Sequence, residues 1–491
     1  MLHLQTTVLF FIITEFSFKV INMNKHEFLI IGSGPGGYIA AIRAAQLGYN
    51  VAIIEKENTL GGVCLNWGCI PTKSLLHSAL IYHNIKKADV FGINVTNVTC
   101  NFSKIIERSR NVVEKLSNGI SGLMKKNNIK VYSGTAKLLG EGTVEVLDNN
   151  NDKINITSKH IIIATGSHPR NLPNINFDNN IIWNAKNAMT PNIPPKSLAI
   201  IGTGAIGIEF ASFYNTFGTQ VTMIEVRDNI LPLEDHEVSK LMHQILNQKG
   251  IKIYTKSSVT KLEKSNNNAR IQISNTIDLE VDKVILAVGI QPNTDNLGLD
   301  NTKIQIDQAG FIITDKYCCT SESGVYAIGD VAGPPCLAHK ASHEAILCVE
   351  NIAAQEKKIT DCNIHHINKE NIPSCIFSIP QIASIGLTEH QAKSMGYDIK
   401  IGKFNANCSG KAIAIDETEG FVKVIINKTT GELLGAHMIG SEVTEMINGY
   451  IIGKQLEATD RDIISSIFPH PTLSEMIHEA VLASNNESLN S

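Results

Sequence analysis

The chain has 491 residues, of which 43% are hydrophobic and 18% are charged, so it is long enough to form three or four domains with buried cores. Its net charge of -4 and its pI near 6.5 exclude the basic surface that nucleic acids require, and its longest early apolar run, Val8 to Ile13, is too short to span a membrane. Its 10 cysteines are irregularly spaced, which argues against a secreted disulfide framework and favours a reducing, cytoplasmic location.

Residues 1–23 are expected to form an N-terminal extension outside the fold. They contain neither the cationic leader of a secretory signal nor the arginines of a mitochondrial transit peptide. We favour translation from Met23; a degenerate targeting segment is the alternative.

A complete dinucleotide-binding pattern follows. A buried strand over 26–31 leads into the loop GSGPGG, a helix over 38–47 and a second strand over 51–54 that ends at Glu55. Gly32 would form the tight turn, Gly34 would let the backbone approach a pyrophosphate, and Gly37 would allow close helix packing. Glu55 would accept hydrogen bonds from ribose hydroxyls.

Cys64 and Cys69 come next, separated by four residues, and lie within bonding reach if the chain turns once between them. The following helix, expected over 72–85, would direct its positive dipole end at the pair and favour reactive thiolates. The spacing predicts a redox disulfide. The alternative on spacing alone is two buried cysteines that never meet.

The dinucleotide pattern then recurs, with a strand over 197–201, a helix over 208–217 and a strand over 221–224. Gly202, Gly204 and Gly207 repeat the three glycines, and Glu225 stands at the same distance from them as Glu55 does from the first set. One chain is therefore expected to bind two dinucleotides. Glu225 favours NAD over NADP because a carboxylate would repel a 2'-phosphate.

These motifs, with ATG at 164–166, YAIGD at 326–330 and FPHPTLSE at 468–475, resemble the flavin-dependent disulfide oxidoreductases over nearly all of the chain from Met23 to about Ala483. The resemblance implies that the first pattern holds FAD and the second holds NAD. It implies that Lys73 lies against the flavin and pairs with Glu209. Further FAD contacts are implied for a group of residues spread along the chain: Ala136, Thr165, Gly166, Ser167, Asp330 and Ala338.

On the NAD side, the same resemblance implies contacts from Val259 and Gly289. Ile290 stands where the family usually has an arginine, so a contact to the cofactor is expected to be missing. The adjacent Cys318 and Cys319 resemble the vicinal pairs that serve metal or mercury chemistry in some relatives. Those pairs lie at the C-terminus, so we interpret this one as structural and expect no metal site.

His470 and Glu475 would complete the chemistry. Imidazole is suited to take a proton from an incoming dithiol because it titrates near neutral pH, and Glu475 would fix its tautomer. In the family this pair comes from the other subunit, which implies a homodimer.

The expected fold is α/β, with two Rossmann-like dinucleotide-binding domains and a C-terminal α+β dimerisation domain. We expect an FAD domain over 24–160, an NAD domain over 161–286, a central segment returning to the FAD domain over 287–355, and an interface domain over 356–491.

Within the family, the resemblance is greatest to enzymes that oxidise dihydrolipoamide carried on the lipoyl domains of 2-oxo acid dehydrogenase or glycine cleavage complexes. Two alternatives stay open. A related NADPH-dependent disulfide reductase or mercuric reductase would need basic residues where Glu225 stands, or terminal cysteines. An inactive flavin-binding scaffold would not need Cys64, Cys69, His470 and Glu475.

Overall fold

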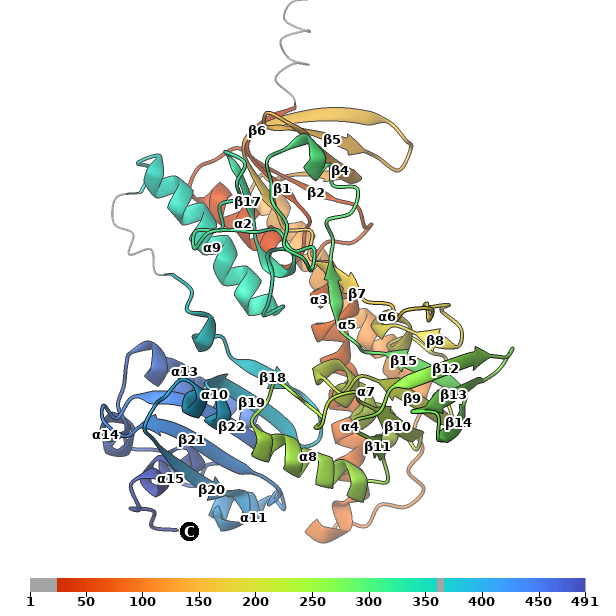
Figure 1. The fold of residues 1–491 in the computed structure, drawn as a ribbon, viewed down its shortest axis with the longest axis vertical. Helices are drawn as coiled ribbons and strands as arrows, with labels where there is room; N and C mark the ends of the chain where they lie inside the picture. The colour runs from red at the N-terminus through yellow and green to blue at the C-terminus, as the bar shows by residue number, and fades with distance from the viewer. Residues whose placement is uncertain (1–23, 360–365, 491) are drawn as a thin grey trace, which may run out of the picture. The chain divides into compact units, whose positions relative to one another are not determined.

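The computed structural model describes residues 24–359 and 366–490, and its contacts divide the chain into two compact units (Figure 1). The first unit takes the residues up to Trp67, Val113–His168 and Ile290–Ile367. The second takes Gly68–Val112, Pro169–Gly289 and the residues from Asn368 onward. The expected N-terminal extension, 1–23, lies outside the described residues.

The first unit is built on a seven-stranded sheet in the order β3-β2-β1-β6-β5-β4, with β17 also paired to β6. The pairs β1–β2, β2–β3, β1–β6 and β6–β17 are parallel, whereas β4–β5 and β5–β6 are antiparallel. The bounds of the strands are β1 (Lys25–Ile31), β2 (Val51–Glu55), β3 (Lys130–Ser133), β4 (Thr135–Gly140), β5 (Thr143–Leu147), β6 (Lys153–Ile163) and β17 (Val325–Ala327).

Alternate side chains of the central strand β1 enter two different cores, because successive side chains of a strand point to opposite faces. Phe28 and Ile30 pack into the core that contains α2, α9 and the second half of α5. Leu29 and Ile31 pack against β4, β5 and the residues before β17. The helices α2 and α9 lie side by side on their face of the sheet (Figure 1).

The helices of this unit are α2 (Pro35–Gln46), α3 (Gly62–Trp67) and α9 (Ala338–Gln355), with the 3-10 turns η2 (Leu299–Asn301) and η3 (Gly329–Ala332) and the short strand β16 (Ile290–Pro292). Two elements, α5 (Phe102–Lys126) and β7 (Ser167–Pro169), cross from one unit to the other along the chain. The helix α2 begins three residues before the position expected from sequence. Pro35 occupies its first turn, where the missing N–H costs no helical hydrogen bond.

Glu356, just after α9, accepts hydrogen bonds from Tyr49 Oη at 2.7 Å and from His160 Nε2 at 2.9 Å, and it pairs with Lys159. Burial raises the pKa of this carboxyl, but the hydrogen bonds from Lys159, His160 and Tyr49 outweigh burial and lower the pKa to about 2. This carboxylate therefore anchors the end of α9 to the sheet.

The second unit contains a parallel sheet in the order β11-β10-β9-β15-β8 and an antiparallel three-stranded sheet, β12-β13-β14. It repeats the plan of the first: in β9, Leu198 and Ile200 pack towards α7 and α8, whereas Ala199 and Ile201 pack against β13. Its elements are α4 (Cys69–Lys86), η1 (Ala88–Phe91), β8 (Ile182–Trp183), α6 (Ala185–Ala188), β9 (Ser197–Ile201), α7 (Ala205–Thr216), β10 (Gln220–Ile224), α8 (His236–Gln248), β11 (Lys252–Tyr254), β12 (Val259–Lys264), β13 (Ala269–Ile273), β14 (Ile277–Val281) and β15 (Lys283–Leu286).

The C-terminal part of the second unit is an antiparallel sheet in the order β18-β19-β22-β21-β20, with α15 packed against β20 and β21. Its elements are η4 (Lys369–Asn371), β18 (Ser374–Ile376), β19 (Gln381–Gly386), α10 (Glu389–Ser394), β20 (Ile399–Asn405), η5 (Ala406–Cys408), α11 (Gly410–Ala414), β21 (Phe421–Asn427), β22 (Leu433–Gly440), α12 (Val443–Met446), α13 (Asn448–Gln455), α14 (Asp460–Ser465) and α15 (Glu475–Ser484).

A buried lysine joins this sheet to the start of α8. The side chain of Lys423 is 1% exposed, and its Nζ lies 3.1 Å from Asp235, 2.8 Å from Glu237 and 2.6 Å from Glu389. Asp235 also caps α8 by accepting from the Glu237 N–H. Three carboxylates thus compensate one buried cation.

The expected α/β fold is confirmed. Among the described residues, no helix is both long and apolar enough to cross a membrane. The division into five sequence segments stays a prediction; residues 68–112, for example, cluster with the second unit rather than with the strands that precede them.

Candidate active site

The first glycine loop is shaped by close backbone approaches. Gly32 has φ +101°, and a Cβ there would lie 2.5 Å from the Ala164 carbonyl oxygen. A Cβ on Gly37 would lie 1.9 Å from the Gly32 carbonyl oxygen. Neither position can therefore accept a side chain without moving the backbone. Gly34 differs, since its Cβ would meet only Gly62 Cα, at 4.0 Å, so one side of the loop is open.

The second glycine loop reproduces this geometry in the other unit. Gly202 has φ +98°, and its Cβ would lie 2.3 Å from the Ala287 oxygen. A Cβ on Gly207 would lie 2.2 Å from the Gly202 oxygen, whereas one on Gly204 would meet nothing within 4 Å. The internal repeat predicted from sequence is thus a repeat of local structure.

Each loop is tied to the acid at the end of the next strand. Glu55 Oε2 accepts from the Ser33 N–H at 2.9 Å and from Ser33 Oγ at 2.6 Å, and its Oε1 accepts from the Glu57 N–H at 2.9 Å. Glu225 accepts in the same way from the Thr203 N–H at 3.0 Å and from Thr203 Oγ1 at 2.7 Å.

The Oε1 of Glu225 accepts from the Arg227 N–H at 2.9 Å, as Glu55 does from Glu57. Both carboxylates are 7% exposed. Each carboxylate oxygen has two lone pairs, so each Oε1 can accept one further hydrogen bond from a ribose hydroxyl. Sequence reasoning missed Ser33 and Thr203, although a hydroxyl residue directly after the first glycine of both loops was a visible signal.

Both loops fit a dinucleotide. Gly34 and Gly204 are the N-cap residues of α2 and α7, and both helices begin without a side-chain cap and without an acidic residue in the first turn. Apart from Pro35, which has no N–H, the backbone N–H groups of these first turns have no side-chain cap, and such an uncapped helix start is the arrangement that binds a pyrophosphate.

Cys64 lies in α3 of the first unit, and Cys69 is the first residue of α4 in the second. Gly68, with the non-helical angles φ -139° and ψ -116°, separates the two helices. The helix α4 begins at Cys69 rather than at the expected Thr72, because Pro71 is tolerated in a first helical turn. Both cysteine residues are partly exposed, and the pairing of their sulfurs stays a prediction.

One further residue of the first unit lies close to this region. Burial, and then the nearby Cys64 sulfur, raise the pKa of Tyr38, which directly follows Gly37 in α2. The end of the first glycine loop and Cys64 therefore lie close to each other.

Lys73, one turn into α4, forms the expected pair with Glu209 of α7. Its Nζ lies 2.8 and 3.0 Å from the two carboxylate oxygens and 4.8 Å from the centre of the Phe377 ring. Glu209 Oε1 also accepts from the Phe377 N–H at 2.9 Å. The carboxylate side chain is 6% exposed and the lysine side chain 31%, so the lysine is only partly enclosed.

Asp330, in η3, lies beside the turn over 165–167, and both were expected to contact FAD. Ser167 Oγ donates to Asp330 Oδ2 at 2.7 Å. Asn293 locks this turn, since its Nδ2 donates to Thr165 O at 2.8 Å and its N–H donates to Gly166 O at 2.9 Å. Sequence reasoning missed Asn293, which lies 128 residues from Thr165 and belongs to no motif.

The remaining expected cofactor contacts fall in four places. Ala136 is 7% exposed in β4, Ala338 is the first residue of α9, and Val259 begins β12. Gly289 has φ +107° and accepts from the Arg170 N–H at 3.0 Å, and Ile290 begins β16.

His470 and Glu475 form a pair before and at the start of α15. His470 Nδ1 lies 2.9 Å from Glu475 Oε1, and Glu475 Oε2 accepts from the Thr472 N–H at 2.9 Å. Burial raises the pKa of Glu475, but the bonds from Thr472 and His470 outweigh burial and lower it. The ionised carboxylate therefore holds the ring by Nδ1 and leaves Nε2 to exchange a proton. The imidazole is 79% exposed.

The adjacent cysteines show no sign of redox chemistry. Cys318 is 5% exposed, and burial raises its pKa well above the ordinary value; burial and Asp315 raise the pKa of Cys319 to about 11. Thiols of high pKa are poor nucleophiles at neutral pH, which supports the structural interpretation. In the part of the chain that the structure describes, no three His, Cys, Asp or Glu side chains are grouped to hold a metal ion.

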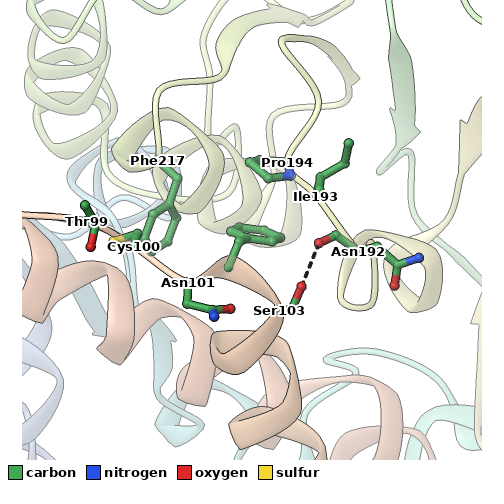
Figure 2. Close-up of a pocket in the computed structure, with 9 residues that line it drawn as sticks. Thr99, Cys100, Asn101, Ser103, Asn192, Ile193, Pro194 and Phe217 are labelled. Atoms are coloured by element: carbon green, nitrogen blue, oxygen red, sulfur yellow. Dashed lines mark hydrogen bonds between the residues drawn. The ribbon is translucent and has the colours of Figure 1, made fainter.

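A separate pocket of about 590 Å³ lies in the second unit and contains none of the expected site residues (Figure 2). Phe102 and Phe217 both line it, with ring centres 5.6 Å apart. Ser103 Oγ, also in the lining, donates to Asn192 O at 3.2 Å (Figure 2). Cys100 and Ile193 also line it.

Comparison with known proteins gives consistent matches over nearly the whole chain. Residues 26–345 match the pyridine nucleotide-disulphide oxidoreductase family, and residues 372–481 match the dimerisation domain of that family. Dihydrolipoyl dehydrogenase from Zymomonas mobilis is 45% identical over 468 residues, covering 94% of this chain and 98% of that protein. Dihydrolipoyl dehydrogenase from Rhizobium etli is also 45% identical, covering 95% and 99%.

Among solved structures, the Cu(II) complex of the HOCl-induced flavoprotein disulfide reductase RclA from Escherichia coli is similar, with a TM-score of 0.83 and 28% identity. The match covers 93% of this chain and 99% of that one.

Proposed function

This chain belongs to the pyridine nucleotide-disulphide oxidoreductase family, and we propose that it oxidises protein-bound dihydrolipoamide to lipoamide and reduces NAD+ to NADH. It is an oxidoreductase that uses FAD and NAD(H). The observation that carries the proposal is the combination, in one chain, of two matched dinucleotide loops, the Cys64 and Cys69 spacing and the hydrogen-bonded His470–Glu475 pair.

The two loops take different cofactors. We assign FAD to the loop closed by Glu55, together with Lys73, Asp330 and the turn over 165–167, and NAD to the loop closed by Glu225. FAD, when bound, supplies the two-electron chemistry that links a dithiol to the nicotinamide ring. Glu225 is buried and negative, so it favours a ribose hydroxyl over a 2'-phosphate.

The protein's own part is thiol exchange. His470 takes a proton from one thiol of the substrate, and the resulting thiolate attacks Cys64 of the oxidised pair, displacing Cys69 as a thiolate. The substrate's second sulfur then attacks the mixed disulfide at the substrate sulfur. Lipoamide leaves, Cys64 and Cys69 remain reduced, and the substrate's two electrons have passed to the protein. Glu475 stabilises the imidazolium formed in the first step.

The active unit is a homodimer, consistent with the dimerisation domain over residues 372–481. We assign His470 to the active site of the partner subunit, because its imidazole is exposed on the chain that carries it. Lipoyl domains of 2-oxo acid dehydrogenase or glycine cleavage complexes are the proposed partners. A cytoplasmic location suits a disulfide that must be cyclically reduced.

A substrate panel tests the activity. The purified protein should oxidise dihydrolipoamide with NAD+ much faster than with NADP+, and it should not reduce glutathione disulfide with NADPH. Preferential use of NADPH with a disulfide or with Hg²⁺ would favour the reductase alternative. Inactivity with every substrate, in protein that has bound FAD, would favour the scaffold alternative.

Mixed dimers test the sharing of the site. His470→Gln and Cys64→Ser homodimers should each be inactive with dihydrolipoamide. In a mixed dimer, one site combines an intact cysteine pair with an intact partner histidine, so activity should reappear after subunit exchange. Failure to regain activity, with heterodimers demonstrated, would mean that each chain supplies its own histidine.

A further inference from the structure

A buried ion pair on α9 is hydrogen-bonded to the segment that carries Asp330. Lys340 and Glu344 stand one turn apart on α9, and Lys340 Nζ lies 3.0 Å from Glu344 Oε1. Their side chains are 2% and 14% exposed. Neither residue belongs to the thiol chemistry or to the two glycine loops, so a different role must account for a buried charge at this place.

Both side chains bind the backbone of the segment Gly329–Gly333. The Gly329 N–H donates to Glu344 Oε2 at 2.7 Å. Lys340 Nζ donates to the Gly329 carbonyl at 3.2 Å and to the Gly333 carbonyl at 2.7 Å. The two charges therefore hold both peptide groups of Gly329 and the far end of the segment.

This arrangement uses the full capacity of the lysine. An ammonium group has three donors, and Lys340 places one on Glu344 and one on each glycine carbonyl. Gly329 and Gly333 have φ +74° and +101°, a region that glycine adopts without strain but that it does not favour over others. External hydrogen bonds are thus what select this shape of the segment.

Asp330 lies inside the held segment. Its carboxylate accepts a hydrogen bond from Ser167 Oγ, and the N–H of the preceding residue, Gly329, donates to Glu344 of α9. The carboxylate position consequently depends on Lys340 and Glu344 through their hydrogen bonds to the backbone of Gly329 and Gly333. The charges of Asp330, Lys340 and Glu344 all act on the thiol of Cys336. Burial first, then Asp330, raise its pKa, Lys340 lowers it, and Glu344 raises it.

We propose that Lys340 and Glu344 are positioning residues that hold the segment Gly329–Gly333, and through it Asp330, in the conformation that binds FAD. The proposal rests on the assignment of Asp330 to the FAD site above. It assigns the buried pair a specific effect, retention of the cofactor, rather than a general contribution to folding.

The test measures FAD release from purified holoenzyme, followed by the rise in free flavin fluorescence on dilution, together with the unfolding of the apoprotein. Lys340→Met should release FAD about 10- to 100-fold faster, the scale of losing hydrogen bonds to a charged group. Lys393→Met is the matched control, because it removes an i,i+4 lysine–glutamate pair whose lysine is 60% exposed. It should release FAD at the wild-type rate.

A double variant separates positioning from simple compensation of charge. Lys340→Met with Glu344→Gln leaves no uncompensated charge, so the apoprotein should regain stability relative to Lys340→Met alone. The carbonyls of Gly329 and Gly333 still have no donor, so FAD release should stay fast. A double variant that retains FAD like wild type would overturn the proposal. It also serves as the test protein if Lys340→Met alone does not fold.

Measurements in the Asp330→Asn variant distinguish this inference from the assignment of Asp330 to the FAD site. Asp330→Asn should itself accelerate FAD release, and adding Lys340→Met should then change the rate little, because both act through one carboxylate. If Asp330→Asn has no effect, the assignment of Asp330 fails. If Asp330→Asn has its effect but Lys340→Met adds its full factor to it, the positioning role fails and the assignment stands.

Discussion

Replacing Glu225 with glutamine should weaken NAD binding and leave FAD binding unchanged. Glu225 accepts from Thr203 through Oε2 and from the Arg227 N–H through Oε1. In a glutamine, one oxygen can still serve Thr203, but the amide nitrogen then faces the Arg227 N–H. Two donors meet there, and no acceptor remains for the ribose hydroxyl.

The size of the effect follows from these bonds. A hydrogen bond to a charged group contributes about 1.5 to 3 kcal/mol, and Glu225→Gln removes the one to the ribose. That loss corresponds to a dissociation constant for NAD raised about 10- to 150-fold. Selectivity against NADP should fall at the same time, because the repelling charge is gone.

The internal repeat supplies the matched control, since Glu55 has the same contacts and the same exposure as Glu225. Glu55→Gln should weaken FAD retention and leave the affinity of the holoenzyme for NAD unchanged. Calorimetric titration with NAD and the rate of flavin release measure the two affinities separately. If both variants lose the same cofactor, or if Glu225→Gln leaves NAD binding intact, the assignment of the loops is wrong.

Three further outcomes are expected. His470→Gln should keep FAD but lose roughly 100- to 10,000-fold in rate with dihydrolipoamide, the usual scale for a general base, while transfer from NADH to an artificial acceptor survives; equal loss of both activities would contradict the role. The pKa of Glu356 is lowered from 4.5 to about 2, so its contribution to stability is complete above pH 4.5 and is lost as the pH falls towards 2. In urea unfolding measured at a series of pH values, Glu356→Gln should therefore make the free energy of unfolding fall less steeply at acid pH. An unchanged pH dependence would refute this. Lys423→Met should lower the free energy of unfolding by about 3 to 5 kcal/mol, because it leaves buried carboxylates without their cation. The control Lys393→Met, at an exposed lysine, should lower it by less than about 1 kcal/mol. Equal midpoints of the two variants in denaturant would exclude the effect.

Local sequence was sufficient to predict the two dinucleotide loops. The tight turn at Gly32, the close helix packing at Gly37 and the acid at Glu55 are all set by residues within one strand–helix–strand unit, and their counterparts from Gly202 to Glu225 are set in the same way. Helix starts were less predictable. Pro35 and Pro71 look like helix breakers in a sequence, yet each occupies a first turn, where a proline is tolerated.

Contacts between distant segments could not be derived from pattern. The pairing of Lys73 with Glu209 spans 136 residues and was expected only through resemblance to a family. Asn293 belongs to no motif. The hydrogen bond from the Gly329 N–H to Glu344 involves a backbone group, which carries no sequence signal. Periodicity predicts which faces are buried; it does not predict which polar atoms meet across them.

The proposed route of electrons from dithiol to nicotinamide is tested most directly by anaerobic reduction of the holoenzyme with one equivalent of dihydrolipoamide. A long-wavelength charge-transfer band from the Cys69 thiolate to FAD should appear, and adding NAD+ should abolish the band and form NADH. Cys69→Ser should never show the band, and Cys64→Ser should show it before any reduction. If the two variants behave alike, or if NADH forms without the band in the wild-type protein, the assignment of Cys64 to substrate exchange and Cys69 to FAD is incorrect.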